Sequence, residues 1–162
     1  MQGRRFEEVG AAAGNALTTP RAARSSAVGD FDNDGALDVL IGVLDGAPVL
    51  ARNVGGAEAG HWLSVRLIGD PDQRCPRDAT GSTVVVSAGG RRLRGEVASG
   101  RVQVSQSDPR VHVGLGAATA VDAVEVRWAG GVTRRYAIDG VNRFVTIDQR
   151  SGQVSYELPR PR

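Results

Sequence analysis

Four aspartates crowd into residues 30–38, DFDNDGALD, at positions 1, 3, 5 and 9 of a loop. Carboxylates this close repel one another unless a cation lies between them. Gly35, at position 6, permits a sharp backbone turn that lets the side chains converge. Ca²⁺ takes six to eight oxygen ligands in a flexible shell, so the spacing predicts a calcium site. The predicted ligands are Asp30, Asp32, Asp34, the main-chain carbonyl of Ala36 at position 7, and Asp38.

The flanks of this loop distinguish it from an EF-hand. An EF-hand loop ends in a bidentate glutamate at position 12 and lies between two helices, but position 12 here is Ile41. The flanking segments are apolar and β-branched without a helical period, which predicts strands. We therefore expect a calcium loop in a β-hairpin. An acidic turn that binds nothing is the alternative, disfavoured because a turn needs one or two such residues.

Composition and charge narrow the class of protein. The 162 residues contain 22 glycines and short valine-rich runs, which is typical of an all-β protein with many turns. No apolar run is long enough to span a bilayer, and the N-terminus lacks the apolar core of a signal peptide. The net charge is +2, and the basic residues, all arginine, are interspersed with acids, which disfavours nucleic-acid binding. Cys75 is the single cysteine, in a polar loop, so no intrachain disulfide forms.

The remaining chain predicts short strands separated by glycine-rich turns. Strands are expected over residues 5–9, 48–53, 61–68, 83–88, 91–98, 103–107, 110–116, 122–128, 132–138, 143–148 and 154–158 in addition to those of the acidic hairpin. Gly89-Gly90 and Gly130-Gly131 are expected to form two-residue hairpin turns. The pattern predicts a propeller-type blade fragment followed by an antiparallel β-sandwich or barrel. The expected boundaries are 1–56 for the blade, 57–60 for a linker, 61–150 for the second domain, and 151–162 for a terminal strand and tail.

Other polar residues carry a weaker case for chemistry. Ser105, Ser107, Asp108 and His112 invite a nucleophile–base interpretation, but no oxyanion-type turn precedes either serine. We expect these groups to satisfy turn backbone instead, so no catalytic residue is predicted.

Few residues outside the acidic loop are candidates for binding a metal or a carbohydrate. The two histidines, His61 and His112, lack a third nearby ligand for a metal. Trp62 and Trp128 are expected in the core rather than as carbohydrate platforms. Asp78 and Thr80 predict an Asx-turn.

Two stretches resemble known families. Residues 26–56, from SAVGDFDNDGALDVLIG to LARNVGG, resemble an FG-GAP/VCBS repeat, which implies a propeller blade whose DxDxDGxxD loop holds Ca²⁺. Residues 61 to about 148 resemble an ASPIC/UnbV domain through HWLSVRL, RDATGSTVVVSAGG, SQSDPRVHVGLG and VDAVEVRW. Their order is that of proteins similar to cartilage acidic protein and its bacterial relatives. Such proteins carry upstream blades and a secretion signal, so we expect this chain to be a C-terminal fragment.

These observations lead to one expected function and two alternatives. The first is a calcium-binding, non-catalytic, extracellular or periplasmic interaction module, with a protein or carbohydrate ligand that the sequence does not specify. The resemblance also admits an accessory role in enediyne-type biosynthesis or carbohydrate processing. A third possibility is a structural domain that caps a propeller. No nucleic-acid partner and no membrane span are expected, and the oligomeric state is left open.

Overall fold

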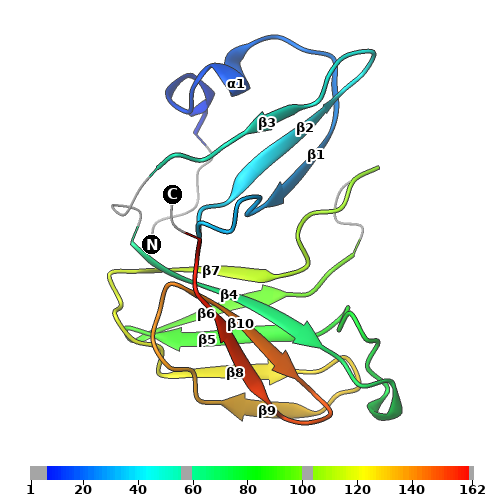
Figure 1. The fold of residues 1–162 in the computed structure, drawn as a ribbon, viewed down its shortest axis with the longest axis vertical. Helices are drawn as coiled ribbons and strands as arrows, with labels where there is room; N and C mark the ends of the chain where they lie inside the picture. Colours follow the sequence, from blue (N-terminus) through cyan, green and yellow to red (C-terminus); the bar gives the residue numbers. More distant parts are fainter. Residues whose placement is uncertain (1–6, 56–59, 100–103, 161–162) are drawn as a thin grey trace.

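The computed structural model describes residues 7–55, 60–99 and 104–160. Its regular structure is almost entirely β and forms three sheets (Figure 1). A three-stranded sheet comes from the first part of the chain, and two four-stranded sheets come from the rest. The predicted all-β class is therefore confirmed. None of the helices in the described ranges has the length and apolar character needed to cross a membrane.

The three-stranded sheet is an antiparallel meander of β1 (Ala23–Gly29), β2 (Asp38–Val43) and β3 (Val49–Ala51). Gly29 pairs with Asp38, so residues 30–37 form the hairpin connection, as the sequence predicted. Within these strands Asp38 is buried, whereas Leu40 and Leu50 remain nearly half exposed. This sheet therefore has no apolar core of its own among the described residues.

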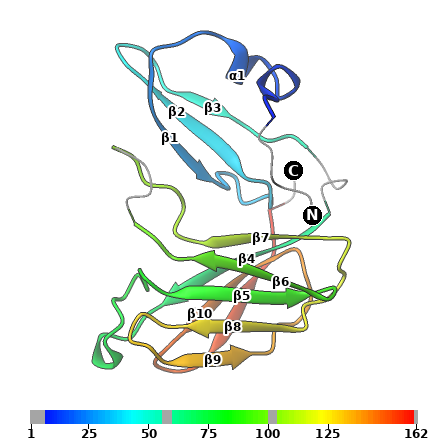
Figure 2. The same ribbon diagram turned by 180° about the vertical axis from the view of Figure 1, so that it is seen from behind.

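Two four-stranded sheets pack face to face below it. One has the order β11-β10-β4-β7 and the other β6-β5-β8-β9. Their strands are β4 (His61–Ile68), β5 (Thr83–Ala88), β6 (Arg91–Glu96), β7 (Val111–Gly116), β8 (Ala123–Arg127), β9 (Thr133–Tyr136), β10 (Arg143–Asp148) and β11 (Val154–Glu157). Figure 2 shows the same layers from behind, with β5 and β8 in front of β10. The sandwich alternative is the one observed, since the two sheets do not close into a barrel.

One strand pair departs from the predicted antiparallel arrangement. β10 runs parallel to β4, from Arg143 opposite Leu63 to Asp148 opposite Ile68. The sequence could not indicate this pairing. The two strands lie about eighty residues apart, and the strand that precedes β10, β9, belongs to the opposite sheet.

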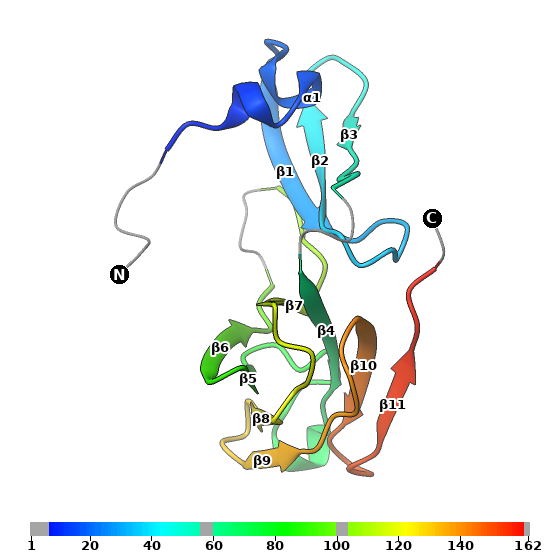
Figure 3. The same cartoon turned by 90° about the vertical axis from the view of Figure 1, so that its left-hand side faces the viewer.

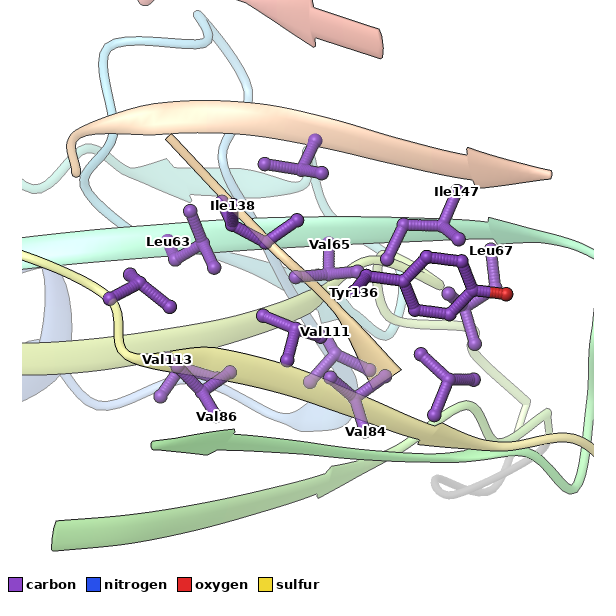
Figure 4. Close-up of a cluster of buried hydrophobic side chains, with 14 of the residues drawn as sticks. Leu63, Val65, Leu67, Val84, Val86, Val111, Val113, Tyr136, Ile138 and Ile147 are labelled. Atoms are coloured by element: carbon purple, nitrogen blue, oxygen red, sulfur yellow. The ribbon is translucent and has the colours of Figure 1, made fainter. Parts of the chain in front are cut away.

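The core lies between the two four-stranded sheets. Alternate residues of β4 and β5 point inward, with Leu63 and Val84 fully buried (Figure 4). Val126 on β8 is fully buried as well. Trp128 also belongs to this core, as predicted, with 1% of its surface exposed. Cys75 is equally buried, which the sequence missed: the loop after β4, with its 3-10 helix η3 (Pro71–Gln73), folds back over the end of the sandwich.

Several sequence-based boundaries differ from the structure. Of the strand predicted at 5–9, residues 5 and 6 lie outside the described residues and Glu7–Val9 are not in a strand. The predicted loop that follows contains a 3-10 helix, η1 (Gly10–Ala12), and one turn of α-helix, α1 (Asn15–Thr18). Of the strand predicted at 103–107, residue 103 lies outside the described ranges and the rest forms a single bridge at Ser105. Residues 57–59 of the predicted linker and residues 161–162 of the tail also lie outside them.

The three-stranded sheet stands on one end of the sandwich. In Figure 3 the acidic hairpin lies above β4, and the chain after β11 runs up beside it. A main-chain hydrogen bond from Arg160 N to Asn33 O, 2.8 Å, holds that last segment against the acidic loop.

Candidate metal centre

The acidic loop is built around the buried carboxylate of Asp30. Its Oδ1 accepts a hydrogen bond from Asp34 N at 3.0 Å, and its Oδ2 accepts one from Gly35 N at 2.9 Å. These bonds bend the chain back on itself, and Gly35 completes the turn at φ = 95°, in the left-handed region. The sequence predicted this turn correctly.

The turn brings three of the four predicted carboxylates together. Asp30, Asp32 and Asp38 each have an oxygen within 4.8 Å of the others. Asp38 is held from two sides, since its Oδ2 accepts from Phe31 N at 3.0 Å and its Oδ1 accepts from Asn53 N at 2.7 Å. Every bond just named leaves the carboxylate oxygens with further lone pairs, so they retain acceptor capacity for a cation.

Asp34 and Ala36 lie at the margin of this group. Asp34 Oδ1 accepts from Ala36 N at 2.9 Å, and Asp34 Oδ2 lies 3.8 Å from the Arg52 guanidinium. The same guanidinium forms an ion pair with Asp32. Of the predicted ligands, the structure thus brings Asp30, Asp32 and Asp38 together, whereas Asp34 is turned toward Arg52.

The acidic loop holds several carboxylates close together, and those of Asp30 and Asp38 are buried. Burial raises the pKa of Asp30 above its usual value, although the hydrogen bonds from Gly35 and Asp34 and the charge of Arg110 act in the opposite direction. A bound cation would remove the penalty of keeping this carboxylate ionised. The all-oxygen donor set, with two acids buried, has the chemistry that a hard divalent cation such as Ca²⁺ prefers.

The loop is seated on an aromatic cluster on the outer face of the β4 sheet. Gly35 contacts Trp62 so closely that a Cβ added at Gly35 would lie 2.2 Å from the indole ring. Trp62 in turn stacks on His112, with ring centroids 5.5 Å apart, and packs against Phe144 at 5.0 Å. Trp62 therefore lies outside the core between the sheets, which corrects the prediction for it. The alternation of β4 decides this, because Leu63 and Val65 take the inward positions.

Arg110 ties the same face of the sandwich to the loop. Its Nη1 donates to Asn33 Oδ1 at 2.7 Å and its Nη2 to the main-chain oxygen of Asp30 at 3.2 Å. Its Nε donates to Asp108 at 2.7 Å, and its guanidinium lies 4.7 Å from the centre of the Phe144 ring. The positive charge of Arg110 is thus neutralised by Asp108, while its other guanidinium nitrogens bind the acidic loop.

The serines considered for catalysis bind the edge of β1 instead. Ser105 Oγ donates to Ser26 O at 2.6 Å, and Ser107 Oγ accepts from Val28 N at 3.1 Å. Asp108 N donates to Val28 O at 2.9 Å. The expectation that side chains satisfy backbone groups is right for the two serines, but the backbone belongs to a strand 79 residues away rather than to their own turn. Asp108 does bind its own turn, since its Oδ1 accepts from Arg110 N at 2.9 Å. The expectation is wrong for His112, whose Nδ1 is buried without a hydrogen-bond partner among the described residues.

The two histidines are not brought together as metal ligands. His61 Nδ1 lies 3.0 Å from Asn142 Nδ2, whereas His112 stacks on Trp62. Burial, followed by the charge of Arg110, lowers the pKa of His112 below its usual value. The Asx-turn at Asp78 is confirmed by a hydrogen bond of 3.1 Å from Thr80 N.

Sequence reasoning missed four residues that shape the metal centre: Arg52, Asn53, Trp62 and Arg110. Arg52 and Asn53 had a usable signal, because they directly follow the third predicted strand of the same meander. Val39 pairs with Ala51, so the next residues along β3 lie beside Asp38. Trp62 and Arg110 had no such signal, since Trp62 lies on β4 and Arg110 directly before β7, both strands of a different sheet.

Comparison with known families covers most of the sandwich but not β4. A family model described as ASPIC and UnbV matches residues 72–154, just over half of the 162 residues. The chain belongs to the ASPIC and UnbV family. The matched region begins in η3, ends at the first residue of β11, and includes the segment that binds β1 and Asn33. The acidic loop precedes the ASPIC and UnbV match. No curated protein matched the chain.

Proposed function

We propose that this protein is a calcium-binding, non-catalytic interaction module that works outside the cytoplasm, in an extracellular or periplasmic setting. The observation that carries the proposal is the convergence of Asp30, Asp32 and Asp38 within 4.8 Å, with the first and last of them buried. Buried carboxylates this close are costly unless a cation neutralises them. Asp34 and the Ala36 carbonyl would add two more oxygens, and water would complete the shell.

Calcium suits this donor set better than other common metals. The ligands are hard oxygens, without the histidine or cysteine that zinc favours. Magnesium demands a small octahedral shell and keeps several waters, whereas a flexible loop of carboxylates accommodates the larger ion. The resemblance of residues 26–56 to an FG-GAP/VCBS repeat of a propeller blade points the same way.

The ion would serve structure rather than reaction chemistry. The acidic loop contacts Trp62 and Arg110, so a cation that rigidifies the loop also stabilises the docking of the three-stranded sheet on the sandwich. The hydroxyls of Ser105 and Ser107 are engaged with β1, which supports a non-catalytic role. We place the ligand surface at the junction, where a cavity of about 620 Å³ is lined by His61, Asn142 and neighbouring residues.

Thermal unfolding with and without calcium tests this proposal. Extracellular calcium modules bind with Kd of about 10⁻⁴–10⁻³ M, so a free Ca²⁺ concentration of about 10 mM would stabilise the protein by about 1.4–2.7 kcal/mol. For a chain of this length, that corresponds to a rise in Tm of about 3–10 °C over the value in EDTA.

The matched variants are Asp32→Asn and Asp45→Asn. Asp32→Asn removes one clustered carboxylate and should abolish most of the calcium-dependent rise. Asp45→Asn removes an exposed acid in the β2–β3 turn, at φ = 54°, a conformation that asparagine tolerates, and should leave the rise intact. A Tm for the unmodified protein that is equal in calcium and EDTA would refute the proposal.

A further inference from the structure

Arg52 lies directly after β3 and reaches into the acidic loop. Its Nη2 forms an ion pair with Asp32 Oδ2 and lies 3.8 Å from Asp34 Oδ2. Asp32 Oδ2 is shielded from water and makes no hydrogen bond of regular geometry, but it is in ion-pair contact with the Arg52 guanidinium. We propose that Arg52 is a built-in counter-cation of the acidic loop, which a divalent cation must displace in order to bind. This inference rests on the calcium site proposed above.

The anchoring of Arg52 fits such a role. Its backbone is fixed on both sides, because Ala51 pairs with Val39 and Asn53 N donates to Asp38 Oδ1. Its side chain is half exposed, at 50%, so the guanidinium can move into solvent without any change in β3. Because the backbone of Arg52 is fixed and its side chain can move, two cations can neutralise the loop: the Arg52 guanidinium or a calcium ion from solution.

Arg110 provides a useful contrast at the same loop. Its guanidinium donates to a main-chain oxygen and to the amide oxygen of Asn33, and its charge is balanced by Asp108. Arg52 instead contacts carboxylates that are proposed calcium ligands. A calcium ion that binds through Asp32 Oδ2 would compete with the Arg52 guanidinium for this oxygen, and the two positive charges would repel each other.

Competition of this kind weakens calcium binding and stabilises the calcium-free loop. A half-exposed ion pair and the repulsion between Ca²⁺ and a nearby guanidinium each contribute modestly in high dielectric. Together they correspond to about a three- to tenfold change in Kd. Arg52 therefore shifts the site toward occupancy only where calcium is abundant.

Calorimetric titration of the full chain with Ca²⁺, together with thermal melts, tests the inference. Arg52→Gln should bind calcium about three- to tenfold more tightly than the unmodified protein. Arg52→Lys keeps the charge but loses the planar fork, so its Kd should lie between the two. The control is Arg92→Gln, which removes an equal charge from an exposed arginine on β6 that pairs with Glu125 at 3.5 Å. Its Kd should stay within about twofold of the original.

The melts give a signature that a merely structural arginine would not produce. In EDTA, Arg52→Gln should melt about 1–3 °C lower, because the acids lose their counter-cation. In saturating calcium the deficit should disappear or reverse. A Kd for Arg52→Gln equal to or weaker than that of a calcium-binding parent would overturn the role of Arg52 and leave the calcium site standing. If neither the parent nor Arg52→Gln binds calcium, the proposed function itself fails.

Discussion

The contact between Gly35 and Trp62 is the point at which the acidic loop meets the sandwich, and Gly35→Ala tests it directly. Two costs are expected. The first arises from φ = 95°, where an L-residue pays about 1–2 kcal/mol. The second arises because the new methyl group would lie 2.2 Å from Trp62 Cε2 and Cζ2, so the indole or the loop must shift. Overpacking of this kind costs about 1–3 kcal/mol more.

Gly131→Ala separates these two costs. Gly131 has nearly the same backbone angle, φ = 96°, but nothing lies within 4 Å of an added Cβ. It should therefore lose only the conformational part, about 1–2 kcal/mol, whereas Gly35→Ala should lose about 2–5 kcal/mol in total. The difference between the two variants measures the loop–tryptophan contact.

The assay is equilibrium unfolding in urea with EDTA present, followed by far-UV circular dichroism and by tryptophan fluorescence. Coincident transitions by the two probes would justify a two-state free energy. Repeating Gly35→Ala in a Trp62→Phe background should reduce its extra cost, since the two residues are in contact. Equal losses for Gly35→Ala and Gly131→Ala would refute the contact as the structure shows it.

Two further predictions concern the sandwich. Leu63→Ala should lower the free energy of unfolding by about 2–5 kcal/mol in the same urea assay, because Leu63 is fully buried. Leu40→Ala should lower it by less than about half as much, because Leu40 is 46% exposed. Similar losses for the two variants would contradict the location of the core. The Arg150 guanidinium, with help from Gln73, lowers the pKa of Asp70 below its usual value. The stability this provides is complete above the unfolded-state pKa of about 3.9 and is lost as the pH falls through the lower folded-state value. Asp70→Asn should therefore flatten the acid limb of a stability–pH profile, and an unchanged limb would exclude this carboxylate as its source.

Local sequence determined the parts of this protein that depend on a few consecutive residues. The acidic hairpin is one example: the bonds that the Asp30 carboxylate accepts from Asp34 N and Gly35 N, and the one that Asp38 accepts from Phe31 N, close within nine residues. Strand positions such as 61–68 and 83–88 were also predictable, because inward and outward side chains alternate there. These features need no information from the rest of the chain.

Tertiary structure decided everything that depends on which strands become neighbours. The parallel pairing of β10 with β4 and the binding of Ser107 to Val28 each join residues roughly eighty positions apart. The cost of closing such long loops is offset only by packing that a local pattern does not encode. The acidic loop was therefore recognisable from nine residues, but its support by Trp62 and Arg110 and its pairing with Arg52 emerged only once the sheets were in place.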